Sequence, residues 1–178
     1  MVEEINCPKA IATTYTGKTL RGLKELRDII FLLDPSVRVE TTRYPDVLLI
    51  YTSLPREILR KLITEKRPSA VARVVIADVC LKVSKENYFE YILKKSIELL
   101  QERKDLPIKF YVDCVSRGKI IESCRMLEIE IGRHIEEAGL GKVLFRESVK
   151  VLKIEAVDDI VILTLMDPEE DRLRKTKK

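Results

Sequence analysis

A short polar segment separates a β-rich run from a helical pattern that begins at Ile120, and it consists of Ser116, Arg117, Gly118 and Lys119. The first turn of a helix leaves backbone N–H groups without partners, and such groups bind anions such as phosphate. Arg117 and Lys119 would add positive charge beside these groups, and Ser116 would add a hydroxyl. The segment therefore predicts a phosphate-binding site at the start of a helix.

Further basic residues in the second half of the chain could widen this site: Arg125, Arg133, Lys142, Arg146, Lys150 and Lys153. Lys150 and Lys153 are three residues apart and would face opposite sides of an ideal strand, which argues against a single basic stripe. A solvated surface is the ordinary alternative for such charges. Their coincidence with the phosphate-binding segment favours an RNA-binding surface.

Two other motifs that could do chemistry have structural explanations. Gly17-Lys18-Thr19 resembles the end of a phosphate-binding P-loop, but Ala12 stands where that motif needs its first glycine. A turn with Thr19 as a helix N-cap explains the residues. The single histidine, His134, follows Glu130 by one helical turn, as in a surface pair, and no nucleophile lies beside it in the sequence. We predict no catalytic residue.

The four cysteines, Cys7, Cys80, Cys114 and Cys124, form no C-x-x-C pair. A tetrahedral zinc site needs closely spaced pairs of ligands, so we predict no metal site and no cofactor. Unpaired thiols in or near the core are expected, and disulfides are not. A small enzyme that uses the thiol of Cys114 or Cys124 remains an alternative.

Composition describes a folded protein with charge concentrated near one end. With 178 residues, 46% of them apolar, the chain has room for one large domain or two small ones. Apolar segments stay below the roughly 18 residues of a membrane span, and the N-terminus lacks signal-peptide features, which predicts a cytoplasmic protein. Abundant charge with few Asn and Gln resembles a thermophile's protein. The last residues, 172–178, are strongly basic.

Hydrophobic periodicity predicts an α+β fold in two domains. In the first half we expect strands at 10–15, 37–42, 47–52 and 71–83, and helices at 19–33 and from about 55 to 67. Their order, β-α-β-β-α-β, is typical of a ferredoxin-like domain. In the second half we expect helices at 85–103 and 120–138, and strands at 108–115, 149–155 and 160–166. The predicted domains are 1–83 and 84–168, followed by a disordered basic tail, 169–178.

The second half resembles a THUMP domain, an RNA-binding module of tRNA-modifying systems. The matching stretches are Phe110-Tyr111-Val112, Arg117-Gly118, Ile131-Gly132, Lys142-Val143 and 151–155 with Asp158-Asp159. THUMP domains are preceded by a ferredoxin-like domain, so the resemblance covers most of the chain. One departure is that Glu147-Ser148-Val149 stands where many members carry Asn-Pro-Asp.

The resemblance implies a protein that binds the acceptor 3′ end of tRNA and presents a distant nucleotide to a catalytic domain. The chain is similar to the stand-alone THUMP adaptor of tRNA cytidine acetyltransferase, which implies a non-enzymatic partner of a separate modification enzyme, of archaeal type. Arg73 lies in a strand that the family also marks with an arginine, and would contribute to RNA binding. A protein–protein regulatory module with a ferredoxin-like fold and no RNA role is the alternative of another class.

Overall fold

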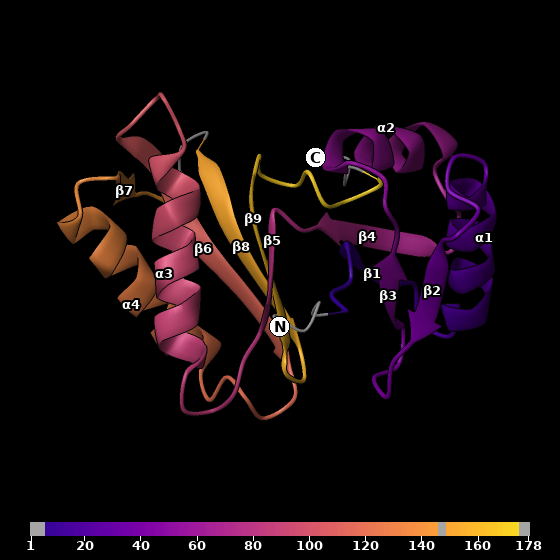
Figure 1. Ribbon diagram of the computed structural model, residues 1–178, viewed down its shortest axis with the longest axis horizontal. Coiled ribbons are helices and arrows are strands. Elements are labelled where there is room, and N and C mark those ends of the chain that lie inside the picture. Colours follow the sequence, from indigo (N-terminus) through magenta and orange to yellow (C-terminus); the bar gives the residue numbers. More distant parts are fainter. Residues whose placement is uncertain (1–5, 146–148, 175–178) are drawn as a thin grey trace, which may run out of the picture. The chain divides into compact units, whose positions relative to one another are not determined.

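The computed structural model describes residues 6–145 and 149–174, which divide into two compact units. Unit 1 contains the described residues up to Ala77 together with those from Glu169 onward, and unit 2 runs from Asp78 to Pro168. Each unit packs two of the four described helices on a β-sheet, so the fold is mixed α+β (Figure 1).

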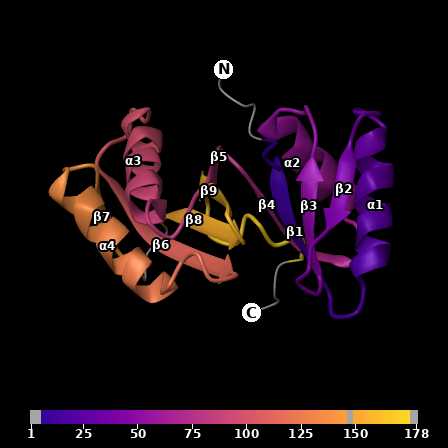
Figure 2. The same ribbon diagram turned by 60° about the horizontal axis from the view of Figure 1, so that its bottom comes forward.

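Unit 1 has a four-stranded antiparallel sheet in the order β2-β3-β1-β4. Along the chain its elements are β1 (Ala10–Thr14), α1 (Thr19–Phe31), β2 (Arg38–Thr41), β3 (Val47–Tyr51), α2 (Arg56–Lys66) and β4 (Val71–Ile76). The register pairs Ile11 of β1 with Leu49 of β3 and with Val75 of β4. Both helices lie on one face of this sheet (Figure 2).

The helices of unit 1 form where apolar residues recur at helical spacing. Leu26 and Ile30 of α1 are four residues apart and fully buried, and Leu59 and Ile63 of α2 repeat the pattern. Pro55 precedes the first turn of α2, where its missing N–H costs nothing. These side chains and the inward residues of the sheet make the core of unit 1.

Asp46 explains the Gly17-Lys18-Thr19 motif. Its carboxylate accepts hydrogen bonds from the Gly17 amide at 3.1 Å, from the Thr19 hydroxyl at 2.9 Å and from the Thr14 hydroxyl at 3.1 Å. The predicted N-cap role of Thr19 is therefore wrong, because its hydroxyl donates to Asp46 and Lys18 holds the cap position. The motif is a turn held by a carboxylate, so the predicted turn is present without the predicted cap.

Unit 2 has a mixed five-stranded sheet in the order β5-β9-β8-β6-β7. Its elements are β5 (Val79–Lys82), α3 (Tyr88–Gln101), β6 (Ile108–Arg117), α4 (Cys124–Glu137), β7 (Gly141–Val143), β8 (Lys150–Val157) and β9 (Ile160–Met166). The pairs β6–β7 and β6–β8 are parallel, and β8–β9 and β9–β5 are antiparallel. Phe110, Ile131 and Leu152 are fully buried between the sheet and its helices.

Two features of the elements differ from the sequence prediction. The expected strand 71–83 divides at Ala77-Asp78 into β4, which pairs with β1, and β5, which pairs with β9, so residues 78–83 belong to unit 2. A continuous apolar run carries no signal for such a change of partner. β7 was not predicted, since three residues that begin with Gly141 show no periodicity.

The predicted disordered tail also differs from the structure. Within the described part of the chain, residues 169–174 lie along β4: the Val74 amide donates to the Asp171 carbonyl at 2.8 Å and the Leu173 amide donates to the Ala72 carbonyl at 3.2 Å. Arg73 forms an ion pair with Asp171 at 3.4 Å. Leu173 packs on the core of unit 1. The remaining four residues of the predicted tail lie outside the described part.

Candidate nucleic-acid interface

The predicted phosphate-binding segment does not lie at the start of a helix. β6 continues to Arg117 because it pairs with β8 as far as Val157. α4 begins only at Cys124, and the hydroxyl of its N-cap, Ser123, accepts a hydrogen bond from the Met126 amide at 3.2 Å. Ser116 and Arg117 are therefore strand residues, and Gly118 and Lys119 begin the loop that precedes the helix.

A disulfide bond joins the two ends of this region. Cys114 in β6 and Cys124 in the first turn of α4 are bonded, with their Cα atoms 5.3 Å apart. The expectation of unpaired thiols is wrong, since a separation of ten residues in sequence becomes a contact once the loop folds back on β6. Neither sulfur is a thiol nucleophile in this state, which removes the basis for a thiol-dependent enzyme. The bond also closes the loop that carries Lys119.

Several of the predicted RNA-binding cations in unit 2 are already paired with acids on the sheet. Arg117 forms an ion pair with Glu155 at 2.8 Å, and the Glu155 side chain is completely buried. Lys153 forms an ion pair with Asp113 at 2.5 Å, and only 3% of its side chain is exposed. Because β6 and β8 are parallel neighbours in register, these pairs join the two central strands. Both cations support the sheet in this arrangement.

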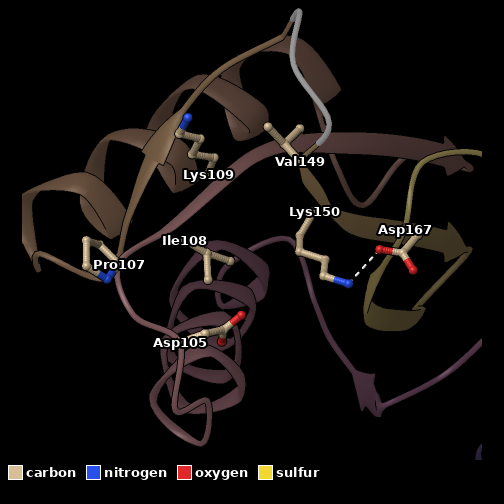
Figure 3. Close-up of a pocket in the computed structure, with 7 residues that line it drawn as sticks. All are labelled: Asp105, Pro107, Ile108, Lys109, Val149, Lys150 and Asp167. Atoms are coloured by element: carbon tan, nitrogen blue, oxygen red, sulfur yellow. Dashed lines mark hydrogen bonds and ion pairs between the residues drawn. The ribbon is translucent and has the colours of Figure 1, made fainter.

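Lys150 lies in a hollow of about 430 Å³ at the beginning of β6 and β8 (Figure 3). Its ammonium group is directed at Asp167, and the ion pair measures 2.5 Å. Asp105, on the same hollow, accepts hydrogen bonds from Arg103, which lower the pKa of its carboxyl group. With two carboxylates on its wall, this hollow is a poor site for a phosphate.

Of the six remaining predicted cations, two more have acidic partners and a third cannot be described. Arg133 is exposed on α4 but bridges Glu130 at 2.5 Å and Glu137 at 2.9 Å, and these bonds raise the pKa of its guanidinium group. Arg73 of unit 1 pairs with Asp171. Arg146 lies outside the described residues.

Lys119, Arg125 and Lys142 are the predicted cations that stay exposed and have no ion pair within the described residues. Lys119 precedes α4, and Arg125 is in its first turn, which contains no acidic residue. The positive end of the helix dipole adds to these charges. The exposed cations around a helix start are therefore Lys119 and Arg125, and this helix start, Cys124, lies four residues later than the predicted one, Ile120.

A groove of about 390 Å³ runs along α4 beside the edge of the sheet. It is lined by apolar atoms and three charged side chains, from Val112, Glu128, Ile129, Gly132, Arg133, Glu136, Val143 and Phe145. Gly132 is a place of close approach, because a Cβ there would lie 3.1 Å from Cγ2 of Val143. Phe145, Glu128 and Glu136 were missed, because nothing in the sequence pattern predicts that α4 and β7 leave a groove between them.

Two absences complete the description of this surface. Over residues 6–145 and 149–174, no group of three His, Cys, Asp or Glu side chains is placed to hold a metal ion. No helix in that same part of the chain is long and apolar enough to cross a membrane.

Comparisons with known proteins place the fold. No family model matches the chain, and no curated protein matches its sequence. Among solved structures, TrmN from Thermus thermophilus is similar, with a TM-score of 0.66 and 18% sequence identity. The match covers 92% of this chain and 46% of the TrmN chain. A 4-thiouridine synthetase in complex with RNA and ATP matches 90% and 42%, with a TM-score of 0.56 and 16% identity. A predicted N6-adenine-specific DNA methylase from Listeria monocytogenes matches 90% and 40%, with a TM-score of 0.52 and 15% identity.

At these identities the likeness shows a shared fold. The chain spans about half the length of the solved structures it matches, or less. The prediction that the protein is not an enzyme is contradicted by this comparison, because the matched structures include a synthetase and a methylase. The sequence prediction rested on the resemblance to a stand-alone THUMP adaptor and on the lack of a recognisable catalytic motif, and neither excluded a fold that occurs in enzymes.

Proposed function

We propose that this chain is the tRNA-binding part of a tRNA-modification system, built from a ferredoxin-like domain in unit 1 and a THUMP domain in unit 2. It would hold the acceptor end of a tRNA and present another nucleotide to the modification reaction. The element order and sheet order of unit 1, together with the THUMP-like motifs of unit 2, support this assignment.

The observation that carries the proposal is that the fold of this chain recurs as part of enzymes that catalyse different reactions. About nine tenths of this chain matches both a 4-thiouridine synthetase bound to RNA and ATP and a methylase. Sulfur transfer and methyl transfer need different catalytic groups, so a shared portion is best explained by a shared task such as holding the nucleic acid. The RNA in the synthetase structure favours this task.

The exposed cations of unit 2 are proposed to make the phosphate contacts. Lys119, Arg125 and Lys142 have the accessibility for this role, and Ser116 and Gly118 belong to the same predicted segment as Lys119. Such contacts fix the position of an RNA without reading its sequence. The paired cations of the sheet are proposed to keep those three in place.

The proposal also concerns which modification enzyme acts on the bound tRNA. The sequence resemblance names a cytidine acetyltransferase as the partner enzyme, whereas the structural matches include a methylase. Trapping the partner on immobilised chain with bound tRNA, followed by mass spectrometry of the captured enzyme, distinguishes the two. Recovery of an acetyltransferase supports the first and of a methyltransferase the second.

Equilibrium binding of the chain to total tRNA as a function of salt tests the RNA-binding role. Each phosphate contact steepens the slope of log K against log salt by about 0.7–0.9. The triple variant Lys119→Gln/Arg125→Gln/Lys142→Gln should therefore bind more weakly and with a slope shallower by roughly 2.

The matched control is Lys24→Gln/Lys66→Gln/Lys94→Gln, which removes the same charge from exposed positions on other helices. It should leave the slope almost unchanged. Equal losses in the two triple variants would show that net charge alone drives binding, and no binding by the wild-type chain would overturn the proposed function.

A further inference from the structure

The groove along α4 lies beside an incompletely paired edge of β6. β7 covers β6 only from Ile108 to Phe110, although β6 continues to Arg117. Val112 of β6 and Val143 of β7 form apolar wall on the sheet side, and Ile129 and Gly132 do so on the helix side. The result is a narrow apolar slot between a helix and a sheet edge.

Two glutamates of α4 enter this slot with one carboxylate oxygen fixed. Oε1 of Glu128 accepts a hydrogen bond from the Cys114 amide of β6 at 2.8 Å. Oε1 of Glu136 accepts one from the Val143 amide at 2.8 Å. Each backbone donor orients its carboxyl group, so the second oxygen of each remains as an acceptor at the groove. Two oriented acceptors in an apolar slot suit a flat group that carries N–H donors.

An exposed aromatic ring lines the slot. Phe145 lines the groove and is 77% exposed, which is unusual for so large an apolar side chain. Its ring lies 5.9 Å from that of Tyr111, tilted by 33°. An exposed ring held by a neighbouring ring is a platform on which an unpaired base can stack.

The charges around the slot fit a single-stranded RNA. Arg125 lies one turn before Ile129 on α4, and Lys142 adjoins Val143 on β7. Both cations are exposed and have no ion pair among the described residues. Phosphates on either side of a stacked base could approach these cations, while the acidic groups stay with the base.

We propose that this groove binds one unpaired nucleobase, adenine or cytosine, which carries an exocyclic amino group at the position where guanine and uracil carry a carbonyl oxygen. The base stacks on Phe145, and its amino group donates to the second oxygen of Glu128 or Glu136. This inference rests on the proposed RNA-binding function and specifies what one part of that surface recognises. Carboxylates accept from the amino group of cytosine or adenine and repel the carbonyl oxygen that uracil presents instead.

Binding of the three eight-nucleotide homopolymers of A, C and U to the full chain tests the inference. The wild type should bind the A and C polymers about tenfold more tightly than the U polymer, the size expected for a hydrogen bond to a charged group. Phe145→Ala should weaken binding of all three by about tenfold, since stacking does not depend on the base. Phe31→Ala, which removes an exposed ring from α1 of unit 1, is the control and should change none.

The double variant Glu128→Gln/Glu136→Gln gives the sharper test. The Cys114 and Val143 amides still require an acceptor, so each new amide places its oxygen there and its NH₂ group at the groove. Acceptors thus become donors, and the preference should pass from A and C to U. Thermal unfolding confirms that the variants are folded.

The outcomes separate this inference from the proposed function. If the wild type binds tRNA but shows no base preference, and neither Phe145→Ala nor the double glutamine variant changes oligonucleotide binding, the groove is not a base site and the function stands. If these variants lose a protein partner while RNA binding is unchanged, the groove belongs to a polypeptide and the inference is overturned. Failure of the wild type to bind any RNA defeats both.

Discussion

Asp34 in unit 1 and Glu155 in unit 2 are both buried carboxylates, but the two units stabilise them differently. Asp34 lies after α1 and accepts hydrogen bonds from the hydroxyls of Ser36 and Thr52 and from the Ser53 amide. Glu155 lies in a central strand and pairs with Arg117 of the neighbouring strand. Neutral donors close to a turn hold the first carboxylate, and a cation on the sheet holds the second.

Pairing of this kind distinguishes two sets of basic residues in unit 2, those in ion pairs within the sheet and those that stay exposed. Arg117 and Lys153 were predicted to bind RNA because they are basic, yet their partners on the sheet make them part of its framework. Lys119 and Arg125 lie just beyond that framework, around the start of α4. The basic residues of unit 2 therefore fall into two groups, those paired with acids within the sheet and those that stay exposed.

Arg117→Ala should produce the largest loss of stability, because it removes the cation that pairs with Glu155. Removing one partner of a buried ion pair costs about 3 kcal/mol of unfolding free energy, because the remaining charge stays in a site of low polarity. Chemical denaturation measures the loss. The double variant Arg117→Leu/Glu155→Leu should recover most of it, and Arg125→Ala, an exposed residue of α4, should cost little. Equal costs for Arg117→Ala and Arg125→Ala would contradict the structural role.

Reduction of the Cys114–Cys124 disulfide should have the next largest effect. A cross-link over a loop of about ten residues stabilises a fold by roughly 2–3 kcal/mol, mainly by restricting the unfolded chain. Denaturation with and without reductant, in the wild type and in Cys114→Ser/Cys124→Ser, measures this difference, because the response that remains in the variant comes from Cys7 and Cys80, which are also disulfide-bonded. If reduction also lowers tRNA affinity while the protein stays folded, the closed loop orients Lys119; unchanged affinity would limit the bond to stability.

Ser123→Ala tests the helix start that replaced the predicted one. Losing the hydroxyl that caps the Met126 amide should cost about 1 kcal/mol. Ser123→Thr retains a capping hydroxyl and should cost less. Urea denaturation of the two variants gives the comparison, and an alanine variant as stable as the threonine variant would show that the cap contributes nothing.

The stabilisation that Asp34 provides should be present in full at neutral pH, and its dependence on pH should appear only in acid. Hydrogen bonds from Ser36, Thr52 and the Ser53 amide lower the pKa of its carboxyl group below the ordinary value of about 4. The folded state therefore takes up this proton less readily than the unfolded state, so the stabilisation is complete above about pH 4 and is lost as the pH falls toward the lowered pKa. Asp34→Asn should flatten the acid limb of the stability profile, and an unchanged limb would contradict the assignment.

Local patterns predicted the elements well, and pairing across the sequence was harder to predict. Periodicity alone predicts the buried helix positions Leu26 and Ile30. It also predicts the order of helices and strands along the chain in unit 1. The helix start at Cys124 could not be predicted, because the strand pairing of Arg117 with Val157 outweighs the turn signal of Gly118. The ion pairs and the disulfide join positions that are close only after folding.

The sequence predicted the candidate site from the types of its residues, and the structure shows which of these residues are accessible. Lys119, Arg125 and Lys142 kept the accessibility that an RNA contact needs, and Arg117 and Lys153 did not. The carboxylates of Glu128 and Glu136 carried no signal in the sequence, since acidic residues on a helix are ordinarily solvated. Their proposed role follows from the hydrogen bonds that they accept from two backbone amides, which the sequence does not show.

The segment 169–174 along β4 has a consequence for the order in which the protein is made. The Val74 amide and the Ala72 carbonyl, on the outer edge of the sheet of unit 1, acquire their partners from residues about 100 positions later in the chain. Unit 2 is contiguous and lies entirely between these partners. During synthesis, unit 2 can therefore finish folding while the edge of unit 1 is still open, so that the unit translated first is the one completed last.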